Sequence, residues 1–447
     1  MTRPPGDLSS RLAPHYSMFD VSRRLLLTGH SHQAWPDVAL DGQIAAFEDA
    51  ARDVDDKWAR AFAQADRVRD GFRAFLGDPD ADPDAGLALG ASTHDLLLRF
   101  LSALDLRRRP RLVTSDGEFH SLRRQLARLG EEGVEVVRLP AEPAGTLAER
   151  LAGALDDRTA AVLVSAVLYE TSRVVPGLDS LAAACARRGA ELLVDAYHAL
   201  GVVPFSTAGI DTAWVVGGGY KYLQLGEGNC FLRLPAHAGS LRPVITGWFA
   251  EFAMLAGDGP AGPVGYPRAG ADRFAGSTYD PTSHYRAARV FDFFARHRLT
   301  PAVLRAVSLR QVGLLAGRFD AIDAPDHVIT RDRAGSPRDF GGFLALRTPH
   351  AGRLCAALRA RGVRTDSRGH HLRFGPAPYL SDAQLAAAMD ALAAELASSG
   401  LVGSGLVGSG LVSSGLAGRG PRTGTASPAA TPPSPDRSAR SVRSRAG

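Results

Sequence analysis

Lysine is nearly absent from this sequence, and cysteine and long apolar runs are scarce. Lysine and arginine together number 52, yet only Lys57 and Lys221 are lysines. Arginine therefore occupies nearly every position at which a plain positive charge would serve. No apolar run approaches the roughly 20 residues of a membrane-spanning helix, and the N-terminal stretch lacks the apolar core of a signal peptide. We therefore expect a cytoplasmic protein with no membrane contact.

The cysteines and the net charge each exclude a class of partner. Cys185, Cys230 and Cys355 lie far apart without metal-ligand spacing, which is typical of buried thiols in a reducing compartment. The formal net charge is +5, but residues 398–447 hold six arginines against one aspartate and account for all of it. The body of the chain is formally neutral, so we expect no nucleic-acid partner.

The order of apolar patterns predicts the fold class. Between residues 87 and 222, short apolar runs typical of strands alternate with helical patterns. Such alternation predicts an α/β fold whose mostly parallel sheet is covered by helices on both faces. We expect an N-terminal arm at 1–36, a large domain at 37–282, a smaller α+β domain at 283–397 and a low-complexity basic tail at 398–447. One apolar helical face is expected along 37–76, from Ile44, Phe47, Val54, Trp58, Phe62, Val68, Phe72 and Phe75.

The stretch 191–222 holds the strongest candidates for chemistry. The apolar run Leu192–Val194 ends at Asp195, and His198 follows three residues later. A second apolar run, 214–216, is followed by three glycines and then by Tyr220 and Lys221. Two strands that end in polar groups place a carboxylate and an amine at one edge of a sheet. In a chain that uses arginine elsewhere, Lys221 is a candidate nucleophile, because an amine can lose its proton and attack a carbonyl. The alternative, a solvated lysine without a role, suits Lys57 better.

Two loops have less specific signals. Residues 90–94 combine glycine, small hydroxyl residues and a helix start, which favours an anion site, although a simple N-cap by Ser92 or Thr93 explains the same pattern. His30 and His32 have the spacing of a metal pair. Without a third ligand nearby, a loop that borders a pocket is the better interpretation, and we expect no metal.

Five motifs in order resemble kynureninase, in the class V branch of the fold type I pyridoxal-phosphate enzymes. The resemblance extends from about Leu25 to Leu396. It includes Asp195-x-x-His198, the glycine-Tyr220-Lys221-Tyr222 segment, Gly247-Trp248-Phe249, Gly276-Ser277-Thr278 and the segment 372–378 around Arg373.

The resemblance implies pyridoxal 5'-phosphate as cofactor and an amino acid as substrate. Lys221 would form the Schiff base with the cofactor and then move the Cα proton, while Asp195 would keep the pyridine nitrogen protonated. The ring of Phe119 would stack on the cofactor. Because a neighbouring subunit would contribute Ser277 or Thr278, the resemblance also implies a homodimer with shared sites. The other implied contacts are Ala91, Ser92 and Tyr220 on the phosphate, His198 and Trp248 on the cofactor, and Arg373 and Tyr169 on the substrate.

Within the class V family, single residues separate the branches. Kynureninases have histidine three residues after the aspartate, as His198 here, whereas cysteine desulfurases usually have glutamine. The loop 365–371 also lacks the nucleophilic cysteine of a desulfurase. Three positions depart from the kynureninase pattern and leave the substrate open: Glu170 replaces a tyrosine, Leu122 an aspartate, and His30 an asparagine.

These residues predict a kynureninase-like hydrolase that cleaves the Cβ–Cγ bond of kynurenine or a related aryl-keto amino acid. The alternative is a class V aminotransferase, or another pyridoxal-phosphate reaction at Cα or Cβ. A non-catalytic relative that only binds a ligand or partner is the third hypothesis.

Overall fold

A seven-stranded sheet forms the centre of the protein. The computed structural model describes residues 8–77, 86–254, 264–266, 270–399 and 401. The five strands from β7 to β4 pair in parallel, whereas β8 runs antiparallel to both of its neighbours. In spatial order the strands are β2 (Leu87–Gly90), β8 (Cys230–Arg233), β7 (Trp214–Gly218), β6 (Glu191–Asp195), β5 (Thr159–Ser165), β3 (Arg111–Ser115) and β4 (Glu135–Leu139).

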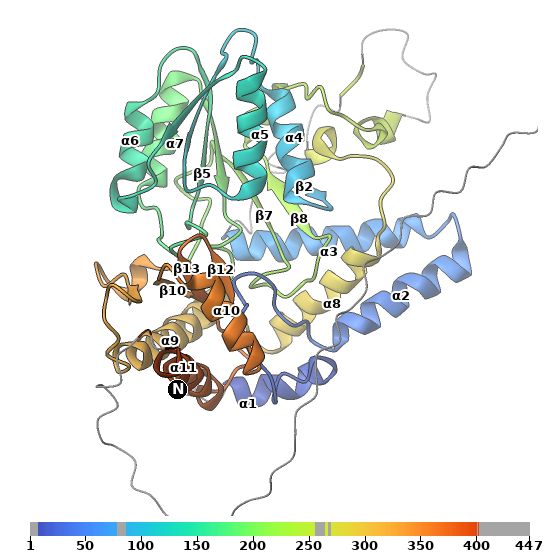
Figure 1. Cartoon of the computed structure of the whole chain (residues 1–447). Coiled ribbons are helices and arrows are strands. Elements are labelled where there is room, and N and C mark those ends of the chain that lie inside the picture. The colour runs from blue at the N-terminus through green and yellow to red at the C-terminus, as the bar shows by residue number, and fades with distance from the viewer. Residues whose placement is uncertain (1–7, 78–85, 255–263, 267–269, 400, 402–447) are drawn as a thin grey trace, which may run out of the picture. The chain divides into compact units, whose positions relative to one another are not determined.

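Helices cover both faces of this sheet (Figure 1). Every residue of β5 is buried, as expected for a parallel strand between two helical layers. Val162 and Val164 join the hydrophobic cluster that includes α6 (Leu147–Gly153) and α7 (Leu178–Arg188). Ala161 and Leu163, which point to the other face, join the cluster that includes α4 (Thr93–Ala103) and α5 (His120–Glu131).

Residues 37–76 form two helices, α2 (Val38–Asp53) and α3 (Trp58–Leu76), and the single apolar face predicted for them is partly wrong. Phe72 of α3 is buried, but Phe47 of α2 is 75% exposed and Val54 is 70% exposed. The reason is that α2 packs on α8 (Thr282–Arg296) through small residues. A Cβ on Gly42 would lie 2.6 Å from the carbonyl oxygen of Tyr285, so the two backbones approach closely and the large side chains of α2 point outward.

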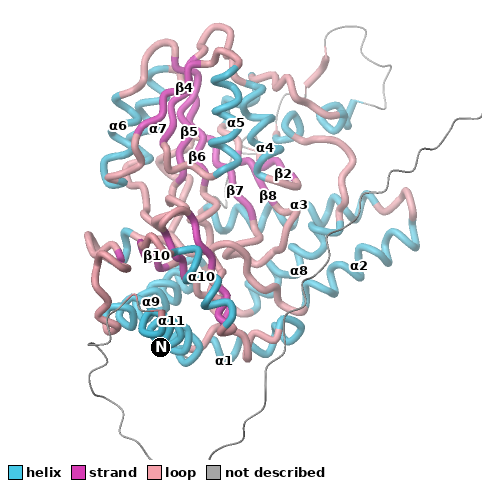
Figure 2. The backbone as a smooth tube through the Cα atoms, viewed as in Figure 1, coloured by secondary structure: helices cyan, strands magenta, loops and turns pink. Residues whose placement is uncertain are grey.

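The C-terminal region has its own sheet and helices (Figure 2). Four antiparallel strands lie in the order β12 (Asp366–Arg368), β13 (His371–Phe374), β10 (Leu344–Arg347) and β9 (Thr330–Arg331). The helices of this region are α9 (Pro301–Asp320), α10 (Ala351–Ala360) and α11 (Asp382–Ser398). Ser381 and Gln384 form a reciprocal capping box at the start of α11.

The N-terminal segment pairs with this C-terminal region. β1 (Leu25–Leu26) lies parallel to β11 (Val363–Arg364), far away in sequence. Before β1 come α1 (Leu8–Leu12) and the 3-10 helix η2 (Ala13–Phe19). The remaining 3-10 turns are η3 (Ala144–Thr146), η4 (Ala236–Ser240), η5 (Trp248–Met254), η6 (Ala271–Phe274) and η7 (Pro337–Asp339).

The prediction of an α/β fold with a mostly parallel sheet and a C-terminal α+β region is confirmed. The boundaries at residues 36 and 282 stay predictions, and most of the predicted tail, from residue 402 on, lies outside the described residues. Cys185 and Cys230 are buried and Cys355 is partly buried. Among the described helices, none has the length and apolar character needed to cross a bilayer.

Candidate active site

A cavity of about 260 Å³ lies at the carboxyl ends of the central strands. Ligands of open α/β sheets bind at this edge, because the strand ends and helix starts present polar groups there. β6 contributes Asp195, and β5 ends beside it at Ser165. Eight of the predicted site residues line the cavity: Ala91, Ser92, Phe119, Tyr169, Asp195, His198, Tyr220 and Lys221.

Lys221 is the buried amine of this cavity. Its side chain is 5% exposed, and its Nζ lies 2.7 Å from Nε2 of His198. The Nζ also lies 5.4 Å from the centre of the Phe119 ring and 4.5 Å from that of Tyr197. Burial lowers the pKa of Lys221 to about 7, with Asp195 raising it and Arg373 lowering it further. A large fraction of the amine is therefore uncharged near neutral pH and can act as a nucleophile.

His198 is held next to this amine in its uncharged form. Burial and the neighbouring Lys221 both keep the pKa of His198 well below its usual value. Its Nδ1 is buried without a hydrogen-bond partner among the described residues. A neutral imidazole with one unpartnered ring nitrogen can accept or donate one further hydrogen bond. In His198 this nitrogen belongs to a residue that lines the cavity.

Asp195 is fixed by the turn that follows β6. The backbone N–H of Tyr197 donates to Oδ1 of Asp195 at 2.8 Å. Burial raises the pKa of Asp195, while that hydrogen bond and the charge of Lys221 lower it. A second carboxyl lies close by, because Ser165, the strand neighbour of Asp195, donates a hydrogen bond to Glu118 at 2.6 Å.

The start of α4 forms one wall of the cavity. Ser92 is the N-cap residue, and its Oγ accepts a hydrogen bond from the backbone N–H of Asp95 at 3.2 Å. The interpretation of Ser92 as an N-cap is therefore correct, and the same helix start also faces the cavity with Ala91, Ser92 and Thr93. Free backbone N–H groups at a helix N-terminus attract anions such as phosphate.

Three predicted cofactor residues lie outside this cavity. Ser277 and Thr278 line a second cavity of about 810 Å³, which shares Ala91 and Gly228 with the first. Trp248, in η5, is 43% exposed and lines neither of these two cavities. The predicted contribution of Ser277 or Thr278 to a neighbouring subunit stays a prediction.

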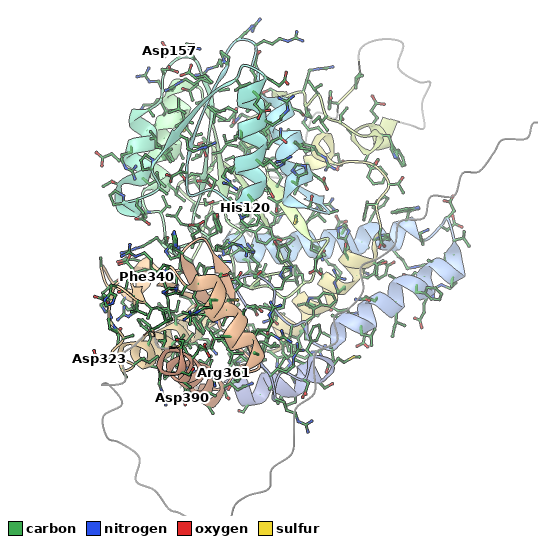
Figure 3. All side chains as sticks on the ribbon, in the orientation of Figure 1. His120, Asp157, Asp323, Phe340, Arg361 and Asp390 are labelled. Atoms are coloured by element: carbon green, nitrogen blue, oxygen red, sulfur yellow. The ribbon has the colours of Figure 1, made fainter. Side chains whose placement is uncertain are left out.

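Arg373, the predicted substrate residue, is buried behind Tyr169. Its Nη1 donates to the backbone carbonyl oxygen of Tyr169, and its Nε and Nη2 donate to the carboxylate of Asp366. Tyr169 lines the cavity, and its hydroxyl donates to Glu170 at 2.9 Å. His120, labelled in Figure 3, begins α5 and packs edge-on against the ring of Tyr169.

Sequence reasoning missed Glu118, although it directly precedes the predicted Phe119. The side chain is 1% exposed, and Ser115 and Ser165 each donate a hydrogen bond to it at 2.6 Å. Burial raises the pKa of Glu118 to about 7, opposed by the two serines and assisted by the charge of Asp195. The only signal in the sequence is an acidic residue at the end of an apolar strand.

His30 and Asp366 form a further pair that the sequence did not reveal. His30 Nε2 lies 2.8 Å from Asp366 Oδ1. No group of three or more histidines, cysteines or carboxylates suited to a metal ion occurs in the part of the chain that the structure describes.

Comparison with known proteins identifies the relationship. A family profile described as "Kynureninase C-terminal domain" matches residues 304–392. The kynureninase of Burkholderia mallei (strain SAVP1) is 30% identical over 234 residues, 51% of this chain and 54% of that protein. The kynureninase of Bacillus cereus is 24% identical over 301 residues, 64% of this chain and 67% of that protein. The chain thus spans about half the length of the first of these relatives.

Solved structures show the same fold. A mutant of the cystine lyase C-DES with glycine covalently linked to its PLP cofactor has a TM-score of 0.74 at 15% identity, over 85% of this chain and 98% of that one. A cysteine desulfurase from Thermococcus onnurineus NA1 has a TM-score of 0.71 at 15% identity, over 88% of this chain and 98% of that one. The chain has a kynureninase-like class V fold. The predicted resemblance to kynureninase and the predicted fold are therefore confirmed, and the class of enzyme, the cofactor and the reaction are argued below as a proposal.

The residues of the cavity fit pyridoxal phosphate. The pKa of Lys221, about 7, suits an amine that reacts with the aldehyde of pyridoxal phosphate. Asp195 lines the same cavity and offers a carboxylate for the pyridine nitrogen. The start of α4 suits a phosphate, and the unpartnered Nδ1 of His198 shows that this imidazole has capacity for a further contact.

Proposed function

We propose that this chain is a pyridoxal-phosphate-dependent hydrolase that cleaves the Cβ–Cγ bond of kynurenine or a related aryl-keto amino acid. The observation that carries the proposal is the buried amine of Lys221, which has a lowered pKa and lies 2.7 Å from the imidazole of His198. Histidine at this position matches the kynureninase pattern, and the kynureninase relatives support the same branch.

The residues of the cavity have separate tasks in this reaction. Bound pyridoxal phosphate supplies a ring that withdraws electrons from the substrate's Cα. Lys221 would hold the cofactor through Nζ and, when freed by the substrate amine, would act as the base and acid for the Cα proton. Asp195 would hold the ring nitrogen of the cofactor in its protonated form. Phe119 would offer an aromatic face for the ring.

The proton transfers depend on the low pKa of Lys221. A base works best when its pKa lies near the operating pH, because it is then free to accept a proton and able to release it. Burial lowers the pKa of Lys221 to about 7, and Nε2 of His198 lies within hydrogen-bond distance of Nζ of Lys221. His198 fixes the position of the amine through this hydrogen bond and adds no second positive charge, because its own pKa is lowered.

A class V aminotransferase is the second candidate, and one observation favours it. Leu122, which stands where kynureninases have an aspartate, lines the cavity with an apolar side chain. An apolar side chain cannot orient the water molecule that hydrolysis requires. Transamination uses water only to release the keto acid, and it needs no water held against a carbonyl of the substrate side chain.

Two measurements test the proposal. The purified protein should show a visible cofactor band that borohydride fixes onto Lys221, and Lys221→Ala should abolish it while Lys57→Ala, at the only other lysine, should leave it intact. Incubation with kynurenine should release anthranilate, detected by its fluorescence, together with alanine. Release of a keto acid with conversion of the cofactor to its amine form would support the aminotransferase instead. A protein without any cofactor band would refute both.

We also propose that two copies of the chain share their active sites. The support is the second cavity of about 810 Å³, which joins the first at Ala91 and has Ser277 and Thr278 in its wall. Sedimentation should give twice the mass of one chain. Ser277→Ala with Thr278→Ala should weaken cofactor binding without changing that mass, and a monomer with full cofactor affinity would contradict the proposal.

A further inference from the structure

The guanidinium of Arg373 is already engaged by a carboxylate of its own chain. Asp366 on β12 and Arg373 on β13 are cross-strand partners. Nε of Arg373 donates to Oδ1 of Asp366 at 2.8 Å, and Nη2 donates to Oδ2 at 2.5 Å. Both residues lie mostly out of solvent, so this bidentate pair is screened little by water.

His30 also contacts Asp366, at the same Oδ1 that accepts from Nε of Arg373. The backbone N–H of Leu27 donates to Arg364, and that of Gly375 donates to Leu27. This pairing extends β1 between β11 and the end of β13 and places His30 beside Asp366. A Cβ at residue 375 would overlap the His30 ring, so glycine is required there.

The protonation states of this trio follow from its geometry. Burial would raise the pKa of Asp366, but the His30 hydrogen bond and the Arg373 charge hold it well below its usual value. Burial lowers the pKa of His30 to about 4, although Asp366 opposes the shift. An ionised carboxylate only accepts hydrogen bonds, so the neutral His30 has its proton on Nε2 and donates it to Asp366.

Counting donors shows what remains for a ligand. A guanidinium has five N–H groups. Asp366 accepts two of those of Arg373, and the backbone oxygen of Tyr169 accepts a third. Within the described part of the chain the other two N–H groups have no hydrogen-bond partner, and two is the number that a second bidentate carboxylate needs. Tyr169, whose backbone oxygen accepts from Arg373, also lines the cavity with Lys221 and His198, so these donors lie next to the reacting centre.

We propose that Asp366 and His30 are positioning residues for substrate recognition. They hold the guanidinium of Arg373 along one edge and leave its two remaining N–H groups for the α-carboxylate of the amino-acid substrate. This inference rests on the proposed function, since it presupposes an amino acid bound at the cofactor. It also gives a role to His30, which stands where kynureninases have an asparagine.

A purely structural role for the trio makes a different prediction. The same C-terminal region contains a matched pair, in which Nε and Nη2 of Arg331 donate to the carboxylate of Asp320 at 2.8 and 2.6 Å. If Asp366 only stabilised its sheet, Asp366→Asn and Asp320→Asn would both lower stability and neither would change ligand preference.

The experiment measures ligand preference without requiring turnover. The holoenzyme is titrated with L-alanine and with L-alaninamide, which lacks the carboxylate, and binding is followed through the visible cofactor band. The ratio of the two dissociation constants is compared among the wild type and the variants Asp366→Asn, His30→Ala, His30→Gln and Asp320→Asn. Comparing ratios between proteins cancels the different basicities of the two amines.

The expected result is a loss of carboxylate preference by about tenfold in Asp366→Asn and His30→Ala, the effect of weakening one charge-assisted contact. His30→Gln should restore most of it, because the amide can donate from nearly the same position. Asp320→Asn should keep the wild-type ratio. Unchanged ratios in His30→Ala and in folded Asp366→Asn would overturn the inference. If Asp366→Asn does not fold, the two His30 variants decide alone. A wild-type band that responds to neither amine would refute the proposed function itself.

Discussion

Replacing Glu118 by glutamine should make the protein more stable, and increasingly so as the pH rises. Burial raises the pKa of Glu118 from 4.5 to about 7. A carboxyl that binds its proton more tightly when folded stabilises the fold fully below pH 4.5, and this contribution is lost as the pH rises to about 7. The shift corresponds to about 3 kcal/mol at 1.36 kcal/mol per pKa unit. Glutamine resembles the protonated acid in shape and hydrogen bonding to Ser115 and Ser165, and it does not ionise.

Urea unfolding of the cofactor-loaded wild type and Glu118→Gln at several pH values measures this effect. The difference in unfolding free energy should grow by about 3 kcal/mol between about pH 4.5 and about pH 8. Other titrating groups cancel, because both proteins contain them. Glu149→Gln, at an exposed position of α6, is the matched control and should change the unfolding free energy by no more than about 0.5 kcal/mol. A pH-independent difference for Glu118→Gln would show that the carboxyl stays ionised in the fold and would refute the reasoning.

Three further predictions concern Lys221, Ser92 and Tyr16. The rate at which cofactor-free protein takes up pyridoxal phosphate should rise with pH and level off above about 7, the pKa of Lys221, and a rise that continued towards 10.5 would contradict the lowered value. Ser92→Ala should cost about 1 kcal/mol of stability and weaken cofactor binding, measured by dialysis, whereas Ser381→Ala at the start of α11 should reduce stability alone. Tyr16→Phe should cost about 1–3 kcal/mol in urea unfolding, because it leaves the buried Gln224 Oε1 without its hydrogen bond, now 2.5 Å long. No loss of stability would mean that this amide finds another partner.

Local sequence patterns were sufficient to place Asp195, His198 and Lys221 together at one edge of the sheet. Asp195, His198 and Lys221 each follow an apolar strand within a few residues, and the carboxyl ends of parallel strands necessarily meet. Phe119, which follows β3, was predicted only from the resemblance to kynureninase. These predictions depend on order along the chain, which a sequence contains directly.

Features that depend on packing between distant segments were not predictable in this way. The pairing of Asp366 with Arg373 requires the register of β12 and β13, and the contact with His30 requires β1 to lie beside β11. The exposed Phe47 shows the same limit, since helical periodicity identifies an apolar stripe but not the neighbour that covers it. The helix that packs on α2 is α8, and its backbone contacts the small residues of α2 rather than the large apolar ones.

The pairing of β1 with β11 also sets an order of events during synthesis. Leu25 leaves the ribosome early, but its partner Val363 is added only after most of the chain. At about 5–20 residues per second, the first strand waits on the order of tens of seconds for the second. The lysine, its aspartate and the start of α4 all lie in earlier segments. The parts that would grip a substrate carboxylate are therefore assembled last, after the parts that would hold the cofactor.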